Sequence, residues 1–301
     1  MIFGPVFSRR FGVSLGIDLS PSKKQCNFDC LYCELKGAKT TPTQDEIVPL
    51  EEILEKIDVA LIEHKNLDVV TITANGEPTL YPYLAEVVEF VNSKKGSAKS
   101  LILSNGANIC DKAIQNILKK LDIVKLSLDS ALQTSFKKLD RPFGNIDVGS
   151  LIECMVEFRA VHKQMLVLET LFVDAINDSW EDVDALKVAF KKIKPDRIDI
   201  GSIARPPAYG VKQISDNRLK EIQERLLPLP VFVATGNYTK HLGEYSQKEI
   251  ELTLKKRPLV QDEVNALFDS DSKDRLENLI KKGLVEKKEF QGKIFYKSLD
   301  F

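Results

Sequence analysis

The segment QCNFDCLYCE (residues 25–34) holds three of the five cysteines of the chain. Cys26, Cys30 and Cys33 are separated by three and then by two residues. Thiolates this close together are typical ligands of a soft metal centre, either zinc or an iron–sulfur cluster. A cubane cluster held by only three cysteines leaves one iron open to an outside ligand. The spacing predicts a metal centre, with an iron–sulfur cluster as the leading interpretation.

Two other interpretations of these cysteines stay open. Structural zinc needs a fourth ligand, usually from a second close pair, and the chain offers only isolated cysteines and scattered histidines. Spacing of i, i+4 and i+7 also fits one face of a helix, where the thiols would be small core side chains. We expect Cys154, within the apolar segment IECMVEF, to be a buried structural thiol. Cys110, at the start of a predicted helix, is more open to a functional role.

The composition narrows the setting. The chain has 301 residues, 43% of them hydrophobic, with 43 basic and 44 acidic side chains. A balance this close to neutral gives no general attraction to nucleic acid or membranes, so such contacts would need a local patch. No apolar run approaches the roughly 18 residues of a membrane helix, and the start lacks the apolar segment of a secretory signal. With three cysteines too close together for paired disulfides, we predict a reduced, cytoplasmic protein.

The hydrophobic pattern alternates short β-branched runs with longer amphipathic stretches over about 235 residues. Strand followed by helix, repeated six times, predicts parallel strands covered by helices. We therefore expect an α/β fold with a full or partial barrel rather than an open doubly wound sheet. No GxGxxG follows any strand, so a nicotinamide site is not expected. The predicted strands are 13–19, 68–74, 100–105, 122–129, 165–173, 197–203 and 231–234, and the predicted helices are 49–64, 83–95, 110–120, 148–163, 179–193 and 216–226.

The carboxyl ends of the predicted strands are polar. In parallel β/α folds the functional groups gather at these ends, because the loops there converge over the mouth of the barrel. Turn formation explains single Gly, Asn and Pro residues. It explains less well the alternation of Lys125, Ser127 and Asp129 on one face of a strand that should be buried. Further polar residues at strand ends are Asn75, Gly76, Glu77, Ser104, Asn105, Glu169 and Arg205.

CNFDCLYC resembles the CxxxCxxC signature of the radical S-adenosylmethionine (SAM) superfamily, including the aromatic Tyr32 before the last cysteine. The resemblance implies a [4Fe-4S] cluster whose open iron is chelated by SAM. Reduction of the cluster would release a 5'-deoxyadenosyl radical that abstracts hydrogen from a substrate. Gly76-Glu77-Pro78 resembles the superfamily segment that hydrogen-bonds the SAM amino group. The resemblance also implies cofactor contacts at Asn75, Ser104, Asn105, Ser127, Asp129 and Glu169, and a partial (β/α)6 barrel.

Four longer segments, starting with FGPVFSRRFGVSLGIDLSPSKKQCNFDCLYCE, resemble the group related to the tRNA wyosine-base synthase. The others are KLSLDS, LETLFVDAINDS and ARPPAYG. That synthase uses pyruvate and a second cluster, which needs three more cysteines before the signature. Residues 1–25 contain none, so its pyruvate chemistry is not expected here.

Cations at the mouth are candidates for contact with the substrate. We expect Lys125, Arg141 and Arg205 to clamp a carboxylate or phosphate group, or else to pair with Asp129 and Glu77. The adjacent Arg9 and Arg10 would cover the mouth or form an exposed basic pair.

After about residue 240 the pattern predicts three short helices and a two-stranded ribbon, the outline of a winged helix-turn-helix. We divide the chain into a barrel domain (1–240) and this small domain (241–301). Residues 246–301 carry 12 basic and 11 acidic side chains, a weaker excess than most nucleic-acid modules show. Nucleic-acid contact and a docking or lid role both stay open.

Together these features predict a cytoplasmic, oxygen-sensitive radical SAM enzyme that receives electrons from a flavodoxin or ferredoxin-like donor. A tRNA base is the leading substrate, and a peptide or small metabolite is the alternative. A different class of protein also fits: a regulator that senses redox state through the cluster and binds DNA through the winged helix.

Overall fold

The computed structural model describes residues 1–233, 243–290 and 292–299. Its main feature is an eight-stranded sheet whose strands follow one another in chain order. The first two strands are antiparallel and form a hairpin, and every later strand joins in parallel. The strands are β1 (Ile2–Ser8), β2 (Gly12–Asp18), β3 (Val69–Thr73), β4 (Lys99–Ser104), β5 (Ile123–Ser127), β6 (Met165–Phe172), β7 (Arg197–Ser202) and β8 (Val231–Val233).

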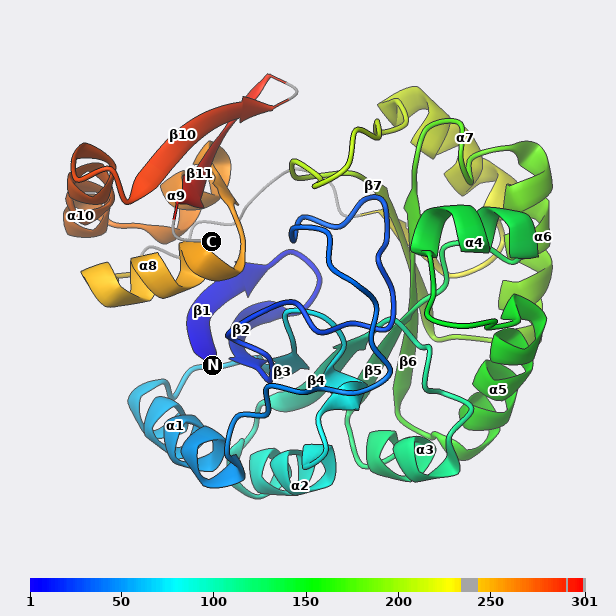
Figure 1. Cartoon of the computed structure of the whole chain (residues 1–301), viewed down its shortest axis with the longest axis horizontal. Coiled ribbons are helices and arrows are strands. Elements are labelled where there is room, and N and C mark those ends of the chain that lie inside the picture. Colours follow the sequence, from blue (N-terminus) through cyan, green and yellow to red (C-terminus); the bar gives the residue numbers. More distant parts are fainter. Residues whose placement is uncertain (234–242, 291, 300–301) are drawn as a thin grey trace.

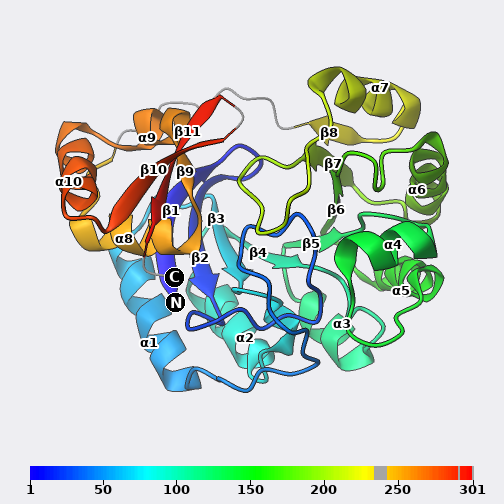
Figure 2. The ribbon, with the colours of Figure 1, turned by 45° about the horizontal axis from the view of Figure 1, so that its top comes forward.

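Helices cover the outer side of the sheet, which curves into a crescent (Figure 1). The apolar side chains between sheet and helices form the main core, and the central strands are buried along most of their length. The long loop after β2 crosses the open, inner side of the crescent (Figures 1 and 2). The helices are α1 (Leu50–Glu63), the short 3-10 helix η1 (Pro78–Leu80), α2 (Leu84–Lys94), α3 (Lys112–Leu118), α4 (Gln133–Asp140), α5 (Val148–Val161), α6 (Trp180–Ile193) and α7 (Asp216–Leu226).

The α/β fold with a parallel sheet is confirmed, and every predicted strand and helix of this region is present. The last residue of the strand predicted at 231–234 lies outside the described residues. Three elements were missed: β1, the three-residue 3-10 helix η1 and α4. β1 contains Gly4-Pro5, and proline is tolerated in a sheet mainly at an edge. α4 has only eight residues, fewer than its periodicity needs for recognition. Among the described residues β8 does not pair with β1, so the barrel is partial.

Residues 243–299, here called the C-terminal module, contain three helices and a three-stranded sheet ordered β10-β11-β9. The predicted helices and ribbon are present, and the two-residue strand β9 was not foreseen. Ile250, Leu267 and Leu279 lie in a separate apolar cluster of this module. The elements are α8 (Gln247–Lys256), β9 (Leu259–Val260), α9 (Gln261–Leu267), α10 (Ser270–Lys281), β10 (Val285–Phe290) and β11 (Lys293–Ser298).

The C-terminal module packs against the free edge of the sheet. Phe7 of β1 inserts into the apolar cluster of the module, and the Tyr245 hydroxyl donates to the carbonyl of Pro5 at 3.0 Å. Both figures show α8 beside β1 (Figures 1 and 2). The module thus covers an edge strand that would otherwise present unpaired backbone groups.

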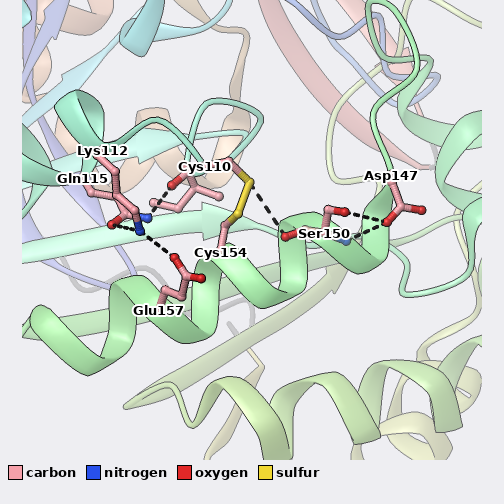
Figure 3. Close-up of a disulfide and its surroundings, with 8 residues drawn as sticks. Cys110, Lys112, Gln115, Asp147, Ser150, Cys154 and Glu157 are labelled. Carbon is pink, nitrogen blue, oxygen red and sulfur yellow. Dashed lines mark hydrogen bonds and ion pairs between the residues drawn. A yellow bond between two sulfur atoms is a disulfide. The ribbon is translucent and has the colours of Figure 1, made fainter.

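Cys110 and Cys154, 44 residues apart, are joined by a disulfide (Figure 3). This corrects two expectations, that Cys154 is a free buried thiol and that all cysteines are reduced. The bond links the loop before α3 to the middle of α5, a tertiary contact that isolated positions in a sequence do not reveal. In the described residues, no helix combines the length and the apolar character needed to cross a bilayer.

Candidate active site

The three clustered cysteines lie in the loop of residues 19–49, which the text below calls the cysteine loop. Its backbone is paired with the segment after β3. Gln25 donates its N–H to the carbonyl of Asn75 at 2.9 Å, and Glu77 donates its own to the carbonyl of Gln25 at 3.0 Å. Gly76, between them, has φ +131°, and a Cβ there would lie 1.9 Å from the Gln25 oxygen. Only glycine allows this approach.

The part of the cysteine loop that contains Cys30 and Cys33 is held by α4 and by the segment after β7. The N–H groups of Asp29 and Leu31 donate to the carbonyls of Asp140 and Leu139, at 3.1 and 2.9 Å. The Cys33 carbonyl accepts from Ala208 in the segment after β7, at 2.8 Å. The cysteine loop therefore lies over the carboxyl ends of β3, β5 and β7, where the sequence predicted the functional side chains.

Burial dominates the electrostatics of the three thiols. It raises the pKa of Cys26 to about 12, with a further contribution from the nearby Glu77. It also raises the pKa of Cys33, and the pKa of Cys30 rises well above its usual value through burial and Asp140. A site like this favours neutral thiols until a positively charged metal centre binds and stabilises the thiolates.

Donors for thiolate sulfur are already in place. The Phe28 N–H lies 3.4 Å from Cys26 Sγ, and the side-chain amide of Asn105 lies 3.5 Å from the same atom. Burial acts to lower the pKa of Lys24, but Cys33 and Asp29 together raise it. Hydrogen bonds and charges of this kind stabilise and tune iron–sulfur clusters.

The arrangement suits a cluster better than a single ion. Within the described ranges, no three His, Cys, Asp or Glu side chains converge to hold one metal ion. Tetrahedral zinc, with Zn–S bonds of about 2.3 Å, would require the sulfurs within about 4 Å of one another. A cubane cluster binds each thiolate through a different iron and has no such requirement. The donor set therefore fits a [4Fe-4S] cluster and disfavours the zinc interpretation.

Asp29, between the first two cysteines, is the anchor of the cysteine loop. Its carboxylate accepts from Lys24 at 2.9 Å and from the Tyr209 hydroxyl at 2.5 Å, and it pairs with Arg141. The Arg141 guanidinium also stacks on the Tyr209 ring, 4.5 Å from its centroid. Arg141, predicted to contact substrate, thus holds the loop. Neither Asp29 nor Tyr209 was singled out by sequence, although Asp29 lies inside the cysteine motif.

Glu77 is fully buried and joins two strand ends. Its carboxylate accepts from the Thr79 N–H at 3.0 Å, the Thr79 hydroxyl at 2.6 Å, the Ser104 hydroxyl at 2.7 Å and the Asn105 N–H at 2.7 Å. Burial raises its pKa despite these donors. Glu77, Ser104 and Asn105, predicted separately, therefore form one unit beside Cys26.

Tyr32 and Asp129 form a second unit, beside Cys30. The Tyr32 hydroxyl donates to Asp129 at 2.6 Å, and the other Asp129 oxygen accepts from the Leu171 N–H at 2.7 Å. Burial raises the pKa of Asp129 to about 6. Cys30 donates to the buried Asp140, at 3.4 Å. Asp140, at the end of the missed helix α4, could not be predicted without that helix.

A charge network with the buried Lys125 and Asp199 at its centre crosses the inner face of β5, β6 and β7. Lys125 lies 2.7 Å from Glu169 and 3.1 Å from Asp199. Arg10 lies 3.3 Å from each of the same carboxylates, and Arg197 lies 2.7 Å from Asp199. Although burial opposes it, the charges of Lys125 and Arg10 lower the pKa of Glu169. Three cations therefore face two carboxylates, and Arg10 is not half of an exposed pair.

A cavity of about 320 Å³ lies next to this network. Asn75, Lys125 and Arg205 line it, together with Glu34, the residue after Cys33. The C-terminal module contributes Arg257 and Glu263, which form an ion pair at 2.8 Å. Arg205 pairs with Glu34 at 3.4 Å. The cavity thus extends from the cysteine loop to the C-terminal module.

The structure brings most predicted residues to one end of the barrel. Ser127 ends β5 opposite Glu169, in register across the sheet. Of the predicted substrate contacts, Lys125 and Arg205 line the cavity, and Arg141 lies on Asp29 outside its lining.

Comparisons with known proteins identify the family of this site. The family model described as "Radical SAM superfamily" matches residues 21–187, more than half of the chain. A UPF0026 protein of Helicobacter pylori is 37% identical over 93% of this chain and 92% of its own length. A GTP 3',8-cyclase of Synechococcus elongatus is 34% identical over 38% of this chain and 34% of its own length.

A solved structure shows the same fold at low sequence identity. A radical SAM methyltransferase from Sphaerobacter thermophilus is 14% identical, with a TM-score of 0.58, over 76% of this chain and 67% of its own. The cysteine segment, Gly76-Glu77-Pro78 and most of the parallel strands lie inside the region that the family model matches.

The approach of Gly76 to Gln25 gives a direct test of the site. Gly76→Ala should displace the cysteine loop, because the new Cβ would overlap the Gln25 carbonyl. We expect iron bound after anaerobic reconstitution to fall at least threefold, and stability to fall by about 1–3 kcal/mol. Gly210→Ala is the control, since no atom lies within 4 Å of its added Cβ. Iron analysis and urea unfolding check both variants, and equal iron content in the two would contradict the prediction.

Proposed function

Because the chain belongs to the radical SAM superfamily of enzymes, we propose that it cleaves SAM reductively at a [4Fe-4S] cluster held by Cys26, Cys30 and Cys33. When bound and reduced, the cluster supplies the electron that splits SAM into methionine and a 5'-deoxyadenosyl radical. The observation that carries this proposal is the set of three half-buried thiols on a loop fixed above the strand ends, beside a cavity. Membership of an enzyme family argues against a purely regulatory protein.

The residues of the chain would bind and orient rather than exchange protons. Hydrogen abstraction by a carbon radical depends on positioning and on exclusion of water. Glu77 would set the position of Ser104 and Asn105 beside the cofactor, as its hydrogen bonds to these two residues indicate. Asn75, at the cavity wall next to Gly76, would contact SAM. Phe3, Phe7 and Phe11 line the cavity and would limit the entry of water.

The cations have different roles in this proposal. Arg205 would contact an anionic group of the substrate from the cavity wall, where Glu34 holds it at 3.4 Å. Lys125 would mainly neutralise Glu169 and Asp199, although it also lines the cavity. Arg141 would act through Asp29 as a positioning residue for the cysteine loop. Electrons would come from a flavodoxin or ferredoxin-like donor.

For the substrate we propose a base in RNA, with a tRNA base as the first candidate. The element order of the C-terminal module, with β9 pairing to β11 of the ribbon, supports a winged helix-turn-helix. Exposed lysines lie at the end of α10 and along the ribbon: Lys281, Lys282, Lys287, Lys288 and Lys293. The same module contributes Arg257 and Glu263 to the cavity, so RNA bound there would be close to it. A peptide or small metabolite is the alternative.

The test of the reaction is the formation of 5'-deoxyadenosine. The reconstituted full chain, with SAM and dithionite under anaerobic conditions, should produce 5'-deoxyadenosine, measured by chromatography. Cys30→Ala should reduce it to background, because one cluster ligand is lost. Lys36→Ala, an exposed change three residues after Cys33, should leave the yield within twofold. A wild-type protein that carries a full cluster yet produces no 5'-deoxyadenosine would refute the proposal.

Arg141 and Arg205 can be separated by iron content. Arg141→Gln removes a charged partner of Asp29, so the cysteine loop should hold the cluster less firmly and bound iron should fall at least twofold. Arg205→Gln removes a cavity side chain and should leave the iron content within error. Iron and sulfide per chain, measured after desalting, distinguish the two. If Arg141→Gln retains as much iron as wild type, Arg141 does not position the cysteine loop.

The RNA proposal predicts a salt-dependent effect of the ribbon lysines. Replacing Lys287, Lys288 and Lys293 by Glu should weaken binding of bulk tRNA at least tenfold. The slope of log affinity against log salt concentration should become shallower by about two. Replacing the exposed Lys119, Lys163 and Lys191 of the barrel domain by Glu is the charge-matched control. Filter binding at several salt concentrations measures both. Equal losses in the two triple variants would mean nonspecific attraction, and no binding by wild type would favour the small-substrate alternative.

A further inference from the structure

The disulfide between Cys110 and Cys154 holds the segment that follows Asn105, one of the proposed SAM contacts, to α5. Cys110 is in the loop of residues 105–111, which connects β4 to α3 and is called here the β4–α3 loop. Cys154 is on α5, and Figure 3 shows the sulfur bond spanning from the loop to this helix. No role for these two cysteines follows from the radical SAM signature, which uses the other three.

The inner end of the β4–α3 loop faces the cysteine loop. Asn105 donates its backbone N–H to Glu77 at 2.7 Å and its side-chain amide to Asn27 at 2.7 Å. Asn108 donates its amide to Thr79 at 3.0 Å and accepts from the Asn27 amide at 3.3 Å. The loop therefore connects the Glu77 unit to the segment between Cys26 and Cys30.

The outer end of the β4–α3 loop is fastened to a rigid helix. Met155, the residue after Cys154, is fully buried, as is Phe158 one turn later. A Cβ on Gly106 would lie 3.0 Å from the end of Met155, so the loop already packs against α5 without the bond. Cys110 itself is exposed, and Cys154 is half-buried. The disulfide adds a covalent link where the loop otherwise reaches solvent.

We propose that Cys110 and Cys154 are positioning residues whose disulfide braces the β4–α3 loop in the geometry that binds SAM. That SAM is the ligand rests on the proposed function; that the disulfide orders the loop does not. With the bond intact, less conformational freedom is lost when the ligand binds. With the bond broken, the loop keeps its hydrogen bonds but gains motion at its outer end. We expect the dissociation constant for SAM to rise three- to tenfold on reduction.

The exposure of Cys110 makes this brace responsive to thiols. A thiolate of a dithiol reductant attacks one sulfur of the pair and forms a mixed disulfide, releasing the partner as a thiolate. The second thiol of the reductant then closes its own disulfide. Two electrons pass from the reductant to the protein, and both cysteines take up protons as thiols. The three cluster cysteines are half-buried free thiols, so they carry no disulfide for the reductant to attack.

The experiment compares the full chain with the disulfide intact and reduced. Protein reconstituted anaerobically without thiols is divided, and one half is treated with dithiothreitol and desalted. Thiol alkylation with mass spectrometry should show Cys110 and Cys154 protected in the first half and modified in the second. Amide hydrogen exchange of residues 105–111 should be at least fivefold faster after reduction, in both cluster-free and cluster-loaded protein. Peptides from α6 should not change.

SAM binding by equilibrium dialysis provides the second measurement. Cys110→Ser should bind SAM like reduced wild type and should not respond to dithiothreitol. Glu157→Gln is the matched control, because it breaks the exposed ion pair to Lys112 (2.5 Å, Figure 3), which links the start of α3, next to the loop, to the same helix α5 without a covalent bond. It should leave the exchange and the dissociation constant within twofold, as expected for a surface pair.

The possible outcomes separate the two proposals. Alkylation of both cysteines before reduction, or equal exchange of residues 105–111 in the two halves, would overturn the brace. An effect of Glu157→Gln as large as that of Cys110→Ser would also overturn it, since any link to α5 would then suffice. Faster exchange without SAM binding in either half would retain an ordering role for the bond and refute the proposed cofactor.

Discussion

The architecture of the site depends on one close approach, between the backbone of Gly76 and that of Gln25. Two hydrogen bonds join the cysteine loop to the end of β3 here, and the space between them excludes even a methyl group. A loop of 31 residues without regular structure has a large entropy of its own, so it needs such fixed points to present three thiols in one arrangement. Asp29, held by Lys24, Tyr209 and Arg141, supplies the second fixed point.

Burial is the common cause behind the properties of the site. It raises the pKa of the three thiols and of Glu77, and it makes each unpaired polar group costly. In the described structure, hydrogen bonds from nearby side chains and backbone groups satisfy these polar groups. Glu77 accepts four hydrogen bonds, and Asp129 accepts from both Tyr32 and the backbone of β6. These networks connect neighbouring strand ends, so the groups nearest the three cysteines are also those that fix the loops between strands.

The sequence was informative where chemistry is carried by residue type and spacing, and less so where it depends on tertiary partners. The cysteine spacing, the Gly76-Glu77 segment and the polar strand ends were all recognisable. The roles of Arg10 and Arg141 were not, because a cation at a strand end looks the same whether it meets a substrate or a buried carboxylate. Asp140 was missed with the short helix α4, and the disulfide was missed because its cysteines are 44 residues apart.

The charges around the cavity constrain what can bind in it. Among the described residues, the ion pairs of the network on β5, β6 and β7 join three cations, Arg10, Lys125 and Arg197, to two carboxylates, Glu169 and Asp199. A buried excess of positive charge is costly unless an anion approaches it, and Arg10 and Lys125 line the cavity where that anion would enter. A substrate with a phosphate or carboxylate would offset this cost more fully than a neutral one. Since Arg257 and Glu263 complete the wall, the barrel alone would present an incomplete cavity, and under the proposed function the C-terminal module would contribute to substrate selectivity.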